Sequence, residues 1–264
     1  MGELRLEDDY DRIVRMTIDK NIPFKVDWEI THRCNLRCQH CYEERPQVID
    51  ELTTGEVFSV IDQLAEMGAL FLTLTGGEIF VRDDIVEICR HARKKDFAVR
   101  LFTNGTLIDA ALAREIKALQ PLAVEISLYG MNPLVHDRIT GVDGSYYRTI
   151  EAFFRLRREG VNTVVKTTVM KNNYGELAAL KQFAASIGSR FVYSLTVVPQ
   201  TTGSRNVIQY RLGEDDLEAL YAADPSLTEG INAGGVKGYD PLCAAGVNSL
   251  YLAPNGDMFP CMLL

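Results

Sequence analysis

The chain has no long apolar run and no excess of basic residues. No stretch approaches the roughly 20 apolar residues that a membrane-spanning helix needs, and the charged start MGELRLEDDYDR is unlike a secretory signal peptide. The 28 Lys and Arg residues are outnumbered by 36 Asp and Glu, which gives a formal net charge of −8. Because an extended nucleic-acid surface needs clustered positive charge, we do not expect this protein to bind nucleic acid. Since it has neither a membrane span nor a signal peptide, we expect a soluble, cytoplasmic protein that does not bind a membrane.

Cysteine is scarce, and its placement is more informative than its number. Only six of the 264 residues are cysteines, and three of them fall in the run CNLRCQHC. An odd-numbered cluster without a signal peptide argues against a disulfide framework. Structural zinc sites usually use two separated ligand pairs, although His32 and His40 lie close enough to supply a fourth zinc ligand. A [4Fe–4S] cluster takes one thiolate per iron, so Cys34, Cys38 and Cys41 would leave one iron open to a small molecule. The spacing favours the cluster over zinc.

Strand and helix patterns alternate between residues 24 and 200, with no internal repeat. Thr53 and Glu56, for example, form a T-x-x-E capping box before apolar residues at helical spacing, and Gly68 closes that helix. The expected strands are 26–31, 70–75, 97–103, 122–128, 161–169 and 190–197. The expected helices are 53–68, 83–95, 109–119, 146–159 and 175–187. This alternation predicts consecutive βα units on a parallel sheet, but it does not distinguish an open doubly wound sheet from a barrel.

The cysteine loop resembles the CxxxCxxC hallmark of the radical SAM superfamily, with Tyr42 as the usual aromatic after the last ligand. Three further runs resemble family motifs in the same order: TGGE at 75–78, FTNG at 102–105 and ISLYG at 126–130. The resemblance covers residues 24–200 and implies an α/β fold, a partial (β/α)6 TIM-like barrel. Each motif falls just after an expected strand, where barrels of this kind gather their active sites.

The resemblance also implies a chemistry. Cys34, Cys38 and Cys41 would hold a [4Fe–4S] cluster whose open iron binds S-adenosylmethionine through its amino and carboxylate groups. An electron from the reduced cluster would cleave this cofactor to a 5′-deoxyadenosyl radical, which abstracts hydrogen from a substrate. An electron donor such as flavodoxin or ferredoxin would supply that electron. The protein would hold the cofactor, orient the substrate and exclude water.

The remaining motif residues are expected to bind the cofactor. Gly76 and Gly77 would let the backbone approach it, and Glu78 would meet its amino group. The alternative for the glycines is an ordinary tight turn after a strand. The further cofactor candidates are Ser127 for the ribose hydroxyls, Asn104 in the TNG motif, Thr168 toward cofactor or substrate, and Tyr42 near the adenine. Strand-end capping is the alternative for Ser127 and Asn104.

Three other side chains are expected to be structural: Cys89 as a small buried hydrophobe, Trp28 in packing and His136 at the surface.

The sequence changes character after residue 200. Residues 1–23 are expected to form an N-terminal segment and residues 201–240 a linker with a short acidic helix near 213–222, followed by an extension over 241–264. The run SLYLAPNGDMFPC predicts a hairpin with an Asn-Gly turn. This hairpin resembles the opening of a SPASM or twitch extension, in which Cys243 and Cys261 would bind an auxiliary [4Fe–4S] cluster. The alternative is a pair of buried or unpaired thiols. Such an extension carries further cysteines, so we expect the C-terminus to be truncated.

The resemblance favours modification of a peptide or protein, because proteins with this extension often cross-link ribosomally made peptides. Modification of a tetrapyrrole or haem-precursor side chain is the second possibility, with a small-molecule substrate. The segment before the barrel is too short for a fused leader-peptide-binding domain, so a separate protein would supply one. A non-catalytic iron–sulfur or zinc protein is the alternative of another class. It would not need Gly76, Gly77 and Glu78 in order after the second strand.

Overall fold

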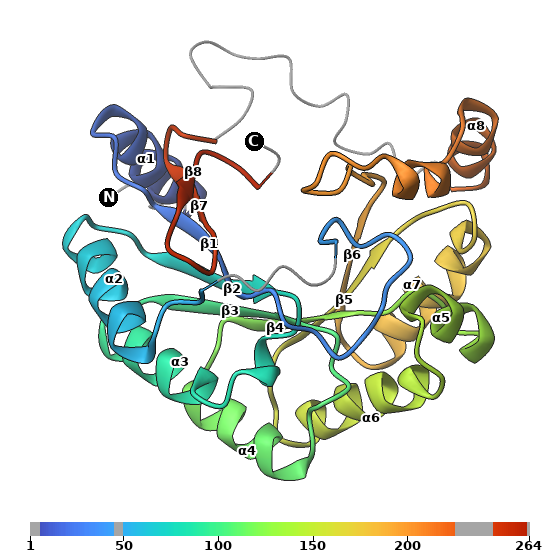
Figure 1. Ribbon diagram of the computed structural model, residues 1–264, viewed down its shortest axis with the longest axis horizontal. Helices are drawn as coiled ribbons and strands as arrows, with labels where there is room; N and C mark the ends of the chain where they lie inside the picture. Colours follow the sequence, from blue (N-terminus) through green and yellow to red (C-terminus); the bar gives the residue numbers. More distant parts are fainter. Residues whose placement is uncertain (1–5, 45–49, 225–244, 263–264) are drawn as a thin grey trace, which may run out of the picture.

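One parallel sheet organises the molecule (Figure 1). The computed structural model describes residues 6–44, 50–224 and 245–262. Six strands pair in parallel in chain order: β1 (Lys25–Thr31), β2 (Phe71–Gly76), β3 (Ala98–Thr103), β4 (Ala123–Ser127), β5 (Thr163–Thr168) and β6 (Arg190–Ser194). A doubly wound sheet would reverse its strand order at a switch point, and these six strands do not. Their single winding direction, with β1 and β6 not paired to each other, is that of a partial TIM-like barrel, as expected.

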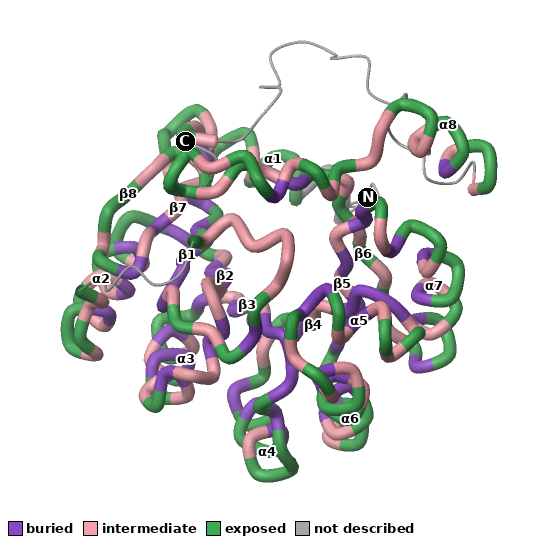
Figure 2. Tube along the Cα trace, turned by 45° about the vertical axis from the view of Figure 1, so that its right-hand side comes forward, coloured by how far each residue is buried: buried purple, intermediate pink, exposed green. Residues whose placement is uncertain are grey.

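Helices follow the strands and cover the outer side of the arched sheet (Figure 1). They are α2 (Thr54–Glu66), α3 (Ile85–Lys94), α4 (Ala110–Leu119), α6 (Ser145–Arg158) and α7 (Leu177–Ser186). Figure 2 shows buried residues along the strands and on the helix sides that face them. The core includes Trp28, Leu74 and Leu101, all fully buried, and Trp28 is therefore the packing residue that we expected.

Local sequence signals explain these elements. The capping box of α2 is confirmed: the Glu56 backbone N–H donates to the Thr53 hydroxyl, and the Thr53 N–H donates to the Glu56 carboxylate at 2.8 Å. In β3, Val99 and Leu101 are buried in the core, whereas Arg100 between them is partly exposed and approaches Glu125. The period of two therefore separates a buried apolar face from an inner face that carries charged residues.

Two helices were not expected from the sequence. The first, α1 (Leu6–Asp19), precedes β1, and the second, α5 (Pro133–Thr140), lies between β4 and α6. The start of α5 has a clear signal, because the Asn132 side chain caps the helix and Pro133 occupies its first turn. The expectation that His136 lies at the surface was wrong. His136 is 1% exposed, since α5 turns it inward and its Nδ1 accepts a hydrogen bond from the Tyr129 N–H at 3.2 Å.

The C-terminal hairpin continues the sheet on the other side of β1. Its first strand, β7 (Ser249–Leu252), runs parallel to β1, and it turns at Gly256 into the antiparallel β8 (Met258–Phe259). The expected hairpin is thus confirmed, as is the acidic helix, which is α8 (Glu214–Ala223). The division into barrel, linker and extension stays a prediction, because residues 225–244 lie outside the described part. Among the described helices, none is both long enough and apolar enough to span a bilayer.

Candidate functional site

The three clustered cysteines lie on the loop that follows β1, and all three are partly exposed. The Leu36 N–H points at the Cys34 Sγ from 3.4 Å, and the Cys41 N–H donates to the Cys38 carbonyl at 3.2 Å. All three thiols lie near the Tyr129 hydroxyl. Burial raises the pKa of that phenol, and the neighbouring thiols raise it further. The loop therefore gathers three soft donors around one buried ring.

The start of this loop is docked on the end of β2. The Gly77 N–H donates to the Thr31 carbonyl at 2.8 Å, and the Glu78 N–H donates to the Arg33 carbonyl at 2.9 Å. A Cβ on Gly76 would lie 2.2 Å from the Thr31 oxygen, and one on Gly77 would lie 2.4 Å from the Arg33 oxygen. Both positions therefore require glycine, because a Cβ at either one would clash with the backbone of the loop. Their contact with a cofactor stays a prediction.

The middle of the loop rests on the C-terminal end of α5. The N–H groups of Arg37 and Gln39 donate to the carbonyls of Thr140 and Ile139 at 2.7 and 2.9 Å. Gly141 has a positive φ of 67°, and a Cβ there would lie 2.6 Å from the Arg37 carbonyl oxygen. These carbonyls at the helix end, which lack partners within a helix, are satisfied by the loop. The loop is therefore held from two sides.

Glu78 joins the ends of β2 and β3. Its carboxylate is 1% exposed and accepts hydrogen bonds from the Thr103 hydroxyl and the Asn104 N–H, both at 2.7 Å. It also accepts one from the Phe80 N–H at 3.1 Å. Burial raises the pKa of Glu78, while these three hydrogen bonds oppose the rise. The predicted contact with the cofactor amino group would add a charged donor to this buried carboxylate.

Asn104 ties the cysteine loop to the end of β3. Its Nδ2 donates to Asn35 Oδ1 at 2.9 Å, and its Oδ1 accepts from the Thr106 N–H at 2.8 Å. The Asn35 Nδ2 donates to the Thr106 hydroxyl at 2.8 Å, so Asn104, Asn35 and Thr106 form one closed hydrogen-bond network. Asn35 and Thr106 were not singled out from the sequence. Their only signal is position, directly after Cys34 and directly after the TNG motif.

Ser127 lies at the end of β4 and is hydrogen-bonded to the Tyr129 phenol. The Tyr129 ring also packs edge to face on His40, with centroids 4.8 Å apart. Burial lowers the pKa of His40 to about 4, so its ring is neutral near pH 7. The buried His40 Nδ1 has no hydrogen-bond partner among the described residues. An unpaired polar atom beside three thiols fits a site completed by a bound group, and three thiols match a [4Fe–4S] cluster with one open iron.

The inner face of the sheet below these motifs is charged. The Lys166 Nζ lies 3.4 Å from the Glu125 carboxylate and 3.4 Å from the centroid of the Phe102 ring. Arg100 approaches the same carboxylate at 3.8 Å. Burial lowers the pKa of Lys166, and Glu125 opposes that shift. Thr168 is two residues further along β5 on the same face, and its predicted contact with cofactor or substrate stays a prediction.

A buried carboxylate, Glu29, lies beside both ends of the cysteine loop. The Tyr42 hydroxyl donates to it, and the His32 Nε2 lies 2.9 Å from its Oε2. Burial opposes protonation of His32, but Glu29 and the nearby Glu43 together raise its pKa. Burial and the carboxylate raise the pKa of Tyr42 well above its ordinary value. No sequence pattern marks Glu29, because it is one of several polar residues in β1.

The other cysteines lie apart from this loop. Cys89 is 1% exposed in α3, where burial raises its pKa to about 12, so its expected structural role is confirmed. Cys261 is partly exposed just after the hairpin, and Cys243 lies outside the described residues. The auxiliary cluster therefore stays a prediction.

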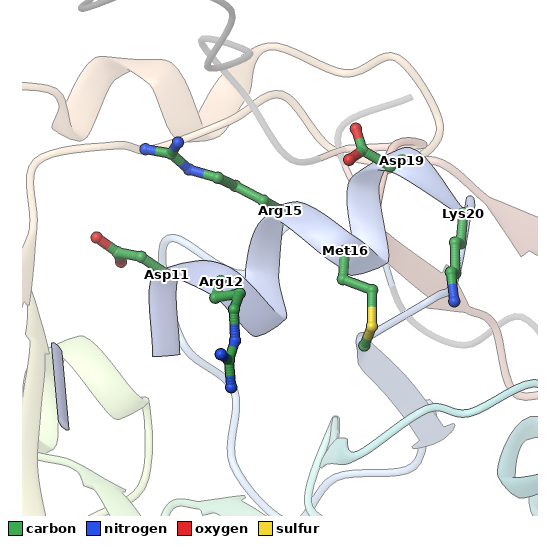
Figure 3. Close-up of a pocket in the computed structure, with 6 residues that line it drawn as sticks. All are labelled: Asp11, Arg12, Arg15, Met16, Asp19 and Lys20. Atoms are coloured by element: carbon green, nitrogen blue, oxygen red, sulfur yellow. The ribbon is translucent and has the colours of Figure 1, made fainter. Parts of the chain in front are cut away.

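The hollow along α1 contains none of the motif residues (Figure 3). It has a volume of about 510 Å³ and is lined by Asp11, Arg12, Arg15, Met16, Asp19 and Lys20. All but Lys20, which directly follows the helix, belong to α1, and the set includes charges of both signs. No chemical function follows from it.

Comparison with known proteins gives a consistent picture. The family model of the radical SAM superfamily matches residues 28–184. An AdoMet-dependent heme synthase from Methanosarcina barkeri is 32% identical over 188 residues, which cover 70% of this chain and 54% of that protein. The subtilosin biosynthesis protein AlbA of Bacillus subtilis is 29% identical over 249 residues, 92% of this chain and 55% of AlbA. The chain thus spans about half the length of these relatives.

Solved structures agree on the fold. SuiB of Streptococcus suis bound to S-adenosylmethionine superposes with a TM-score of 0.76 at 16% identity, covering 97% of this chain and 64% of SuiB. The structure of anSMEcpe with bound AdoMet and a peptide superposes with a TM-score of 0.65 at 18% identity, covering 91% of this chain and 74% of that one. At such identities the likeness concerns the fold alone.

Proposed function

We propose, from the premise that this chain belongs to the radical SAM superfamily, that Cys34, Cys38 and Cys41 bind a [4Fe–4S] cluster and that the chain uses S-adenosylmethionine for hydrogen abstraction. The family uses both cofactors, and SuiB and anSMEcpe were crystallised with this sulfonium compound. When bound, the cluster and the cofactor together supply a 5′-deoxyadenosyl radical. The observation that carries the proposal is the loop of three thiols, docked on β2 and α5 beside the unpaired His40 Nδ1.

The chain's own residues would prepare the site before any cofactor enters. Gly76 and Gly77 fix the loop backbone at the end of β2, and Asn104 fixes it from β3 through Asn35. Rigid positioning of this kind lowers the entropy cost of bringing reactants together. Ser127 and Thr168 would complete the cofactor contacts from the ends of β4 and β5.

The proposal has a direct test. Protein reconstituted with iron and sulfide without oxygen should bind at least about four irons per chain, the content of one [4Fe–4S] cluster. With dithionite and S-adenosylmethionine it should then release 5′-deoxyadenosine, measured by liquid chromatography. A colourless protein that retains zinc through four protein ligands and leaves S-adenosylmethionine intact would exclude this function and favour the non-catalytic alternative.

We propose a peptide or protein as the substrate. Support comes from the similarity to AlbA over 92% of this chain and to the mycofactocin maturase MftC of Mycolicibacterium smegmatis, 26% identical over 90% of this chain and 64% of MftC. SuiB, which shares the fold, was solved with its precursor peptide SuiA. A reduced flavodoxin or ferredoxin would donate electrons, and a separate protein would bind any leader peptide. A cytoplasmic location is part of the same proposal.

Haem-precursor modification is the second candidate, and one observation favours it. The M. barkeri heme synthase is more similar in sequence, at 32% identity, than AlbA or MftC. Two substrates discriminate between the candidates: a short peptide encoded beside the gene, and a porphyrin with propionate side chains. We expect the peptide, and not the porphyrin, to lose hydrogen and shift in mass when the reduced enzyme and S-adenosylmethionine are added. A mass change in the porphyrin alone would reverse the assignment.

A further inference from the structure

We propose that Glu29 is a positioning residue that locks both ends of the cysteine loop together and fastens them to the C-terminal hairpin. This inference rests on the proposed function, because the loop is the predicted cluster site. Glu29 lies in β1, and its side chain is fully buried. Nothing in the family motifs includes it.

The two ends of the loop converge on this single carboxylate. His32 comes two residues before Cys34, and its Nε2 lies 2.9 Å from Glu29 Oε2. Tyr42 comes directly after Cys41, and its hydroxyl donates to Glu29 Oε1. One carboxylate thus fixes the chain where it enters and where it leaves the run of cysteines.

The hairpin reaches the same carboxylate from the other side of β1. Tyr251 of β7 pairs with Asp27 in the sheet register, and its phenol is hydrogen-bonded to Glu29. The outgoing end of the loop is also held apart from Glu29, because the Thr201 N–H donates to the Tyr42 carbonyl at 2.9 Å. The cysteine loop and the hairpin, which are far apart in the sequence, therefore meet at Glu29.

The cost of burying this carboxylate argues for a specific role. Among the described residues, its ion-pair partner is His32, and the two phenols supply neutral donors. A buried carboxylate is expensive unless its oxygens are hydrogen-bonded, and an apolar residue would fill the same space without that cost. Replacing it would leave three donors without their acceptor. The carboxylate connects the start of the loop, the end of the loop and the hairpin. An apolar side chain could not make these connections.

A divalent cation is the competing interpretation of this cluster. Single ligand atoms of Glu29, His32 and Glu43 lie within 4.8 Å of one another. Both Glu29 oxygens are already hydrogen-bonded to Tyr42 and His32, which favours positioning over metal binding. The metal content of variants separates the two interpretations.

Three substitutions test the proposal on the full chain. Glu29→Gln should accelerate loss of iron from the reconstituted protein to a chelator by at least about 10-fold, the cost typical of losing a group that supports a metal ligand. It should also alter the electron paramagnetic resonance signal of the reduced cluster. Tyr42→Phe should change both in the same direction by less. Tyr251→Phe should instead speed hydrogen exchange in 249–252 and leave the loop nearly unchanged.

Asp27→Asn is the matched control, because Asp27 is an exposed carboxylate on the same strand. It should behave as the parent in every measurement. Hydrogen exchange of residues 32–43 in the cluster-free protein gives a second readout, and it should be faster in Glu29→Gln than in Asp27→Asn. This readout holds even if the parent never cleaves S-adenosylmethionine, a failure that would count against the proposed function alone.

Several outcomes would overturn the inference. Glu29→Gln could keep the parent's chelation rate, resonance signal and loop exchange, or Asp27→Asn could change them as much. A bound metal beyond the cluster that disappears in Glu29→Gln, with the loop unaffected, would establish the cation site instead. If Glu29→Gln loses the circular dichroism signal of a folded protein, Tyr42→Phe decides instead. A Tyr42→Phe protein that loses iron at the parent's rate and keeps the parent's resonance signal would then contradict the proposal.

Discussion

Cys38→Ala is expected to abolish release of 5′-deoxyadenosine. Loss of a group that merely supports a metal ligand costs roughly 10–100-fold in metal affinity, and loss of a ligand should cost more. Cys38 lies in the middle of the loop, and its side chain also packs against Tyr129. The reconstituted variant should therefore lose most of its brown colour, and its product release should fall by at least about 100-fold, to the level of protein-free controls.

Cys89→Ala is the control for that experiment. It also removes one thiol, but from the core side of α3, away from the loop. Its iron content and product release should match the parent. Release from Cys38→Ala at the parent rate would show that this thiol is not a ligand, and equal loss in both variants would point to general unfolding.

Gly77→Val is expected to undock the cysteine loop. The new Cβ would lie 2.4 Å from the Arg33 carbonyl oxygen and 2.7 Å from the His32 carbonyl oxygen, both in backbone that no rotamer change can move. Overpacking of this kind costs about 1–3 kcal/mol, before any loss of the backbone hydrogen bonds beside it. We expect a lower free energy of unfolding in denaturant titrations and a protein that does not retain its cluster.

Gly55→Ala provides the matched comparison. Gly55 lies in the first turn of α2, where an added Cβ meets nothing within 4 Å. Alanine in a helix is favoured over glycine, so the stability should be equal to the parent's or slightly higher. A Gly77→Val protein with unchanged stability and a full cluster would contradict the close approach of the two backbones.

Much of the fold follows from local pattern. The six strands and the five covering helices were predicted within a few residues, because the apolar outer face of each element repeats at its own period. The periodicity of apolar residues could not predict the order of the strands in the sheet. The family resemblance predicted that order. The short helix α5 was missed although Asn132 and Pro133 mark its start, since eight residues give too few turns for a clear amphipathic pattern.

The site was predictable only where residues adjoin in sequence. The three thiols share one loop, so their spacing revealed them. Asn35 and Tyr129 act through partners that are distant in sequence, Asn104 and His40, and no local pattern encodes those distances. His136 was misplaced for the same reason, because its hydrogen bond to the Tyr129 backbone exists only once α5 has folded against β4. The glycines were recognised, but their docking of the loop backbone required the tertiary structure.

The position of β7 has a consequence for biosynthesis. A ribosome delivers β1 well before β7, so one edge of β1 waits for its neighbour while strands β2 to β6 are made. An uncovered strand edge is a template for association with other chains. Shortened versions that end before residue 249 should therefore precipitate more readily than the longer chain. Late arrival of the hairpin also means that β7, made after β2 to β6, covers the free edge of the strand that was made first.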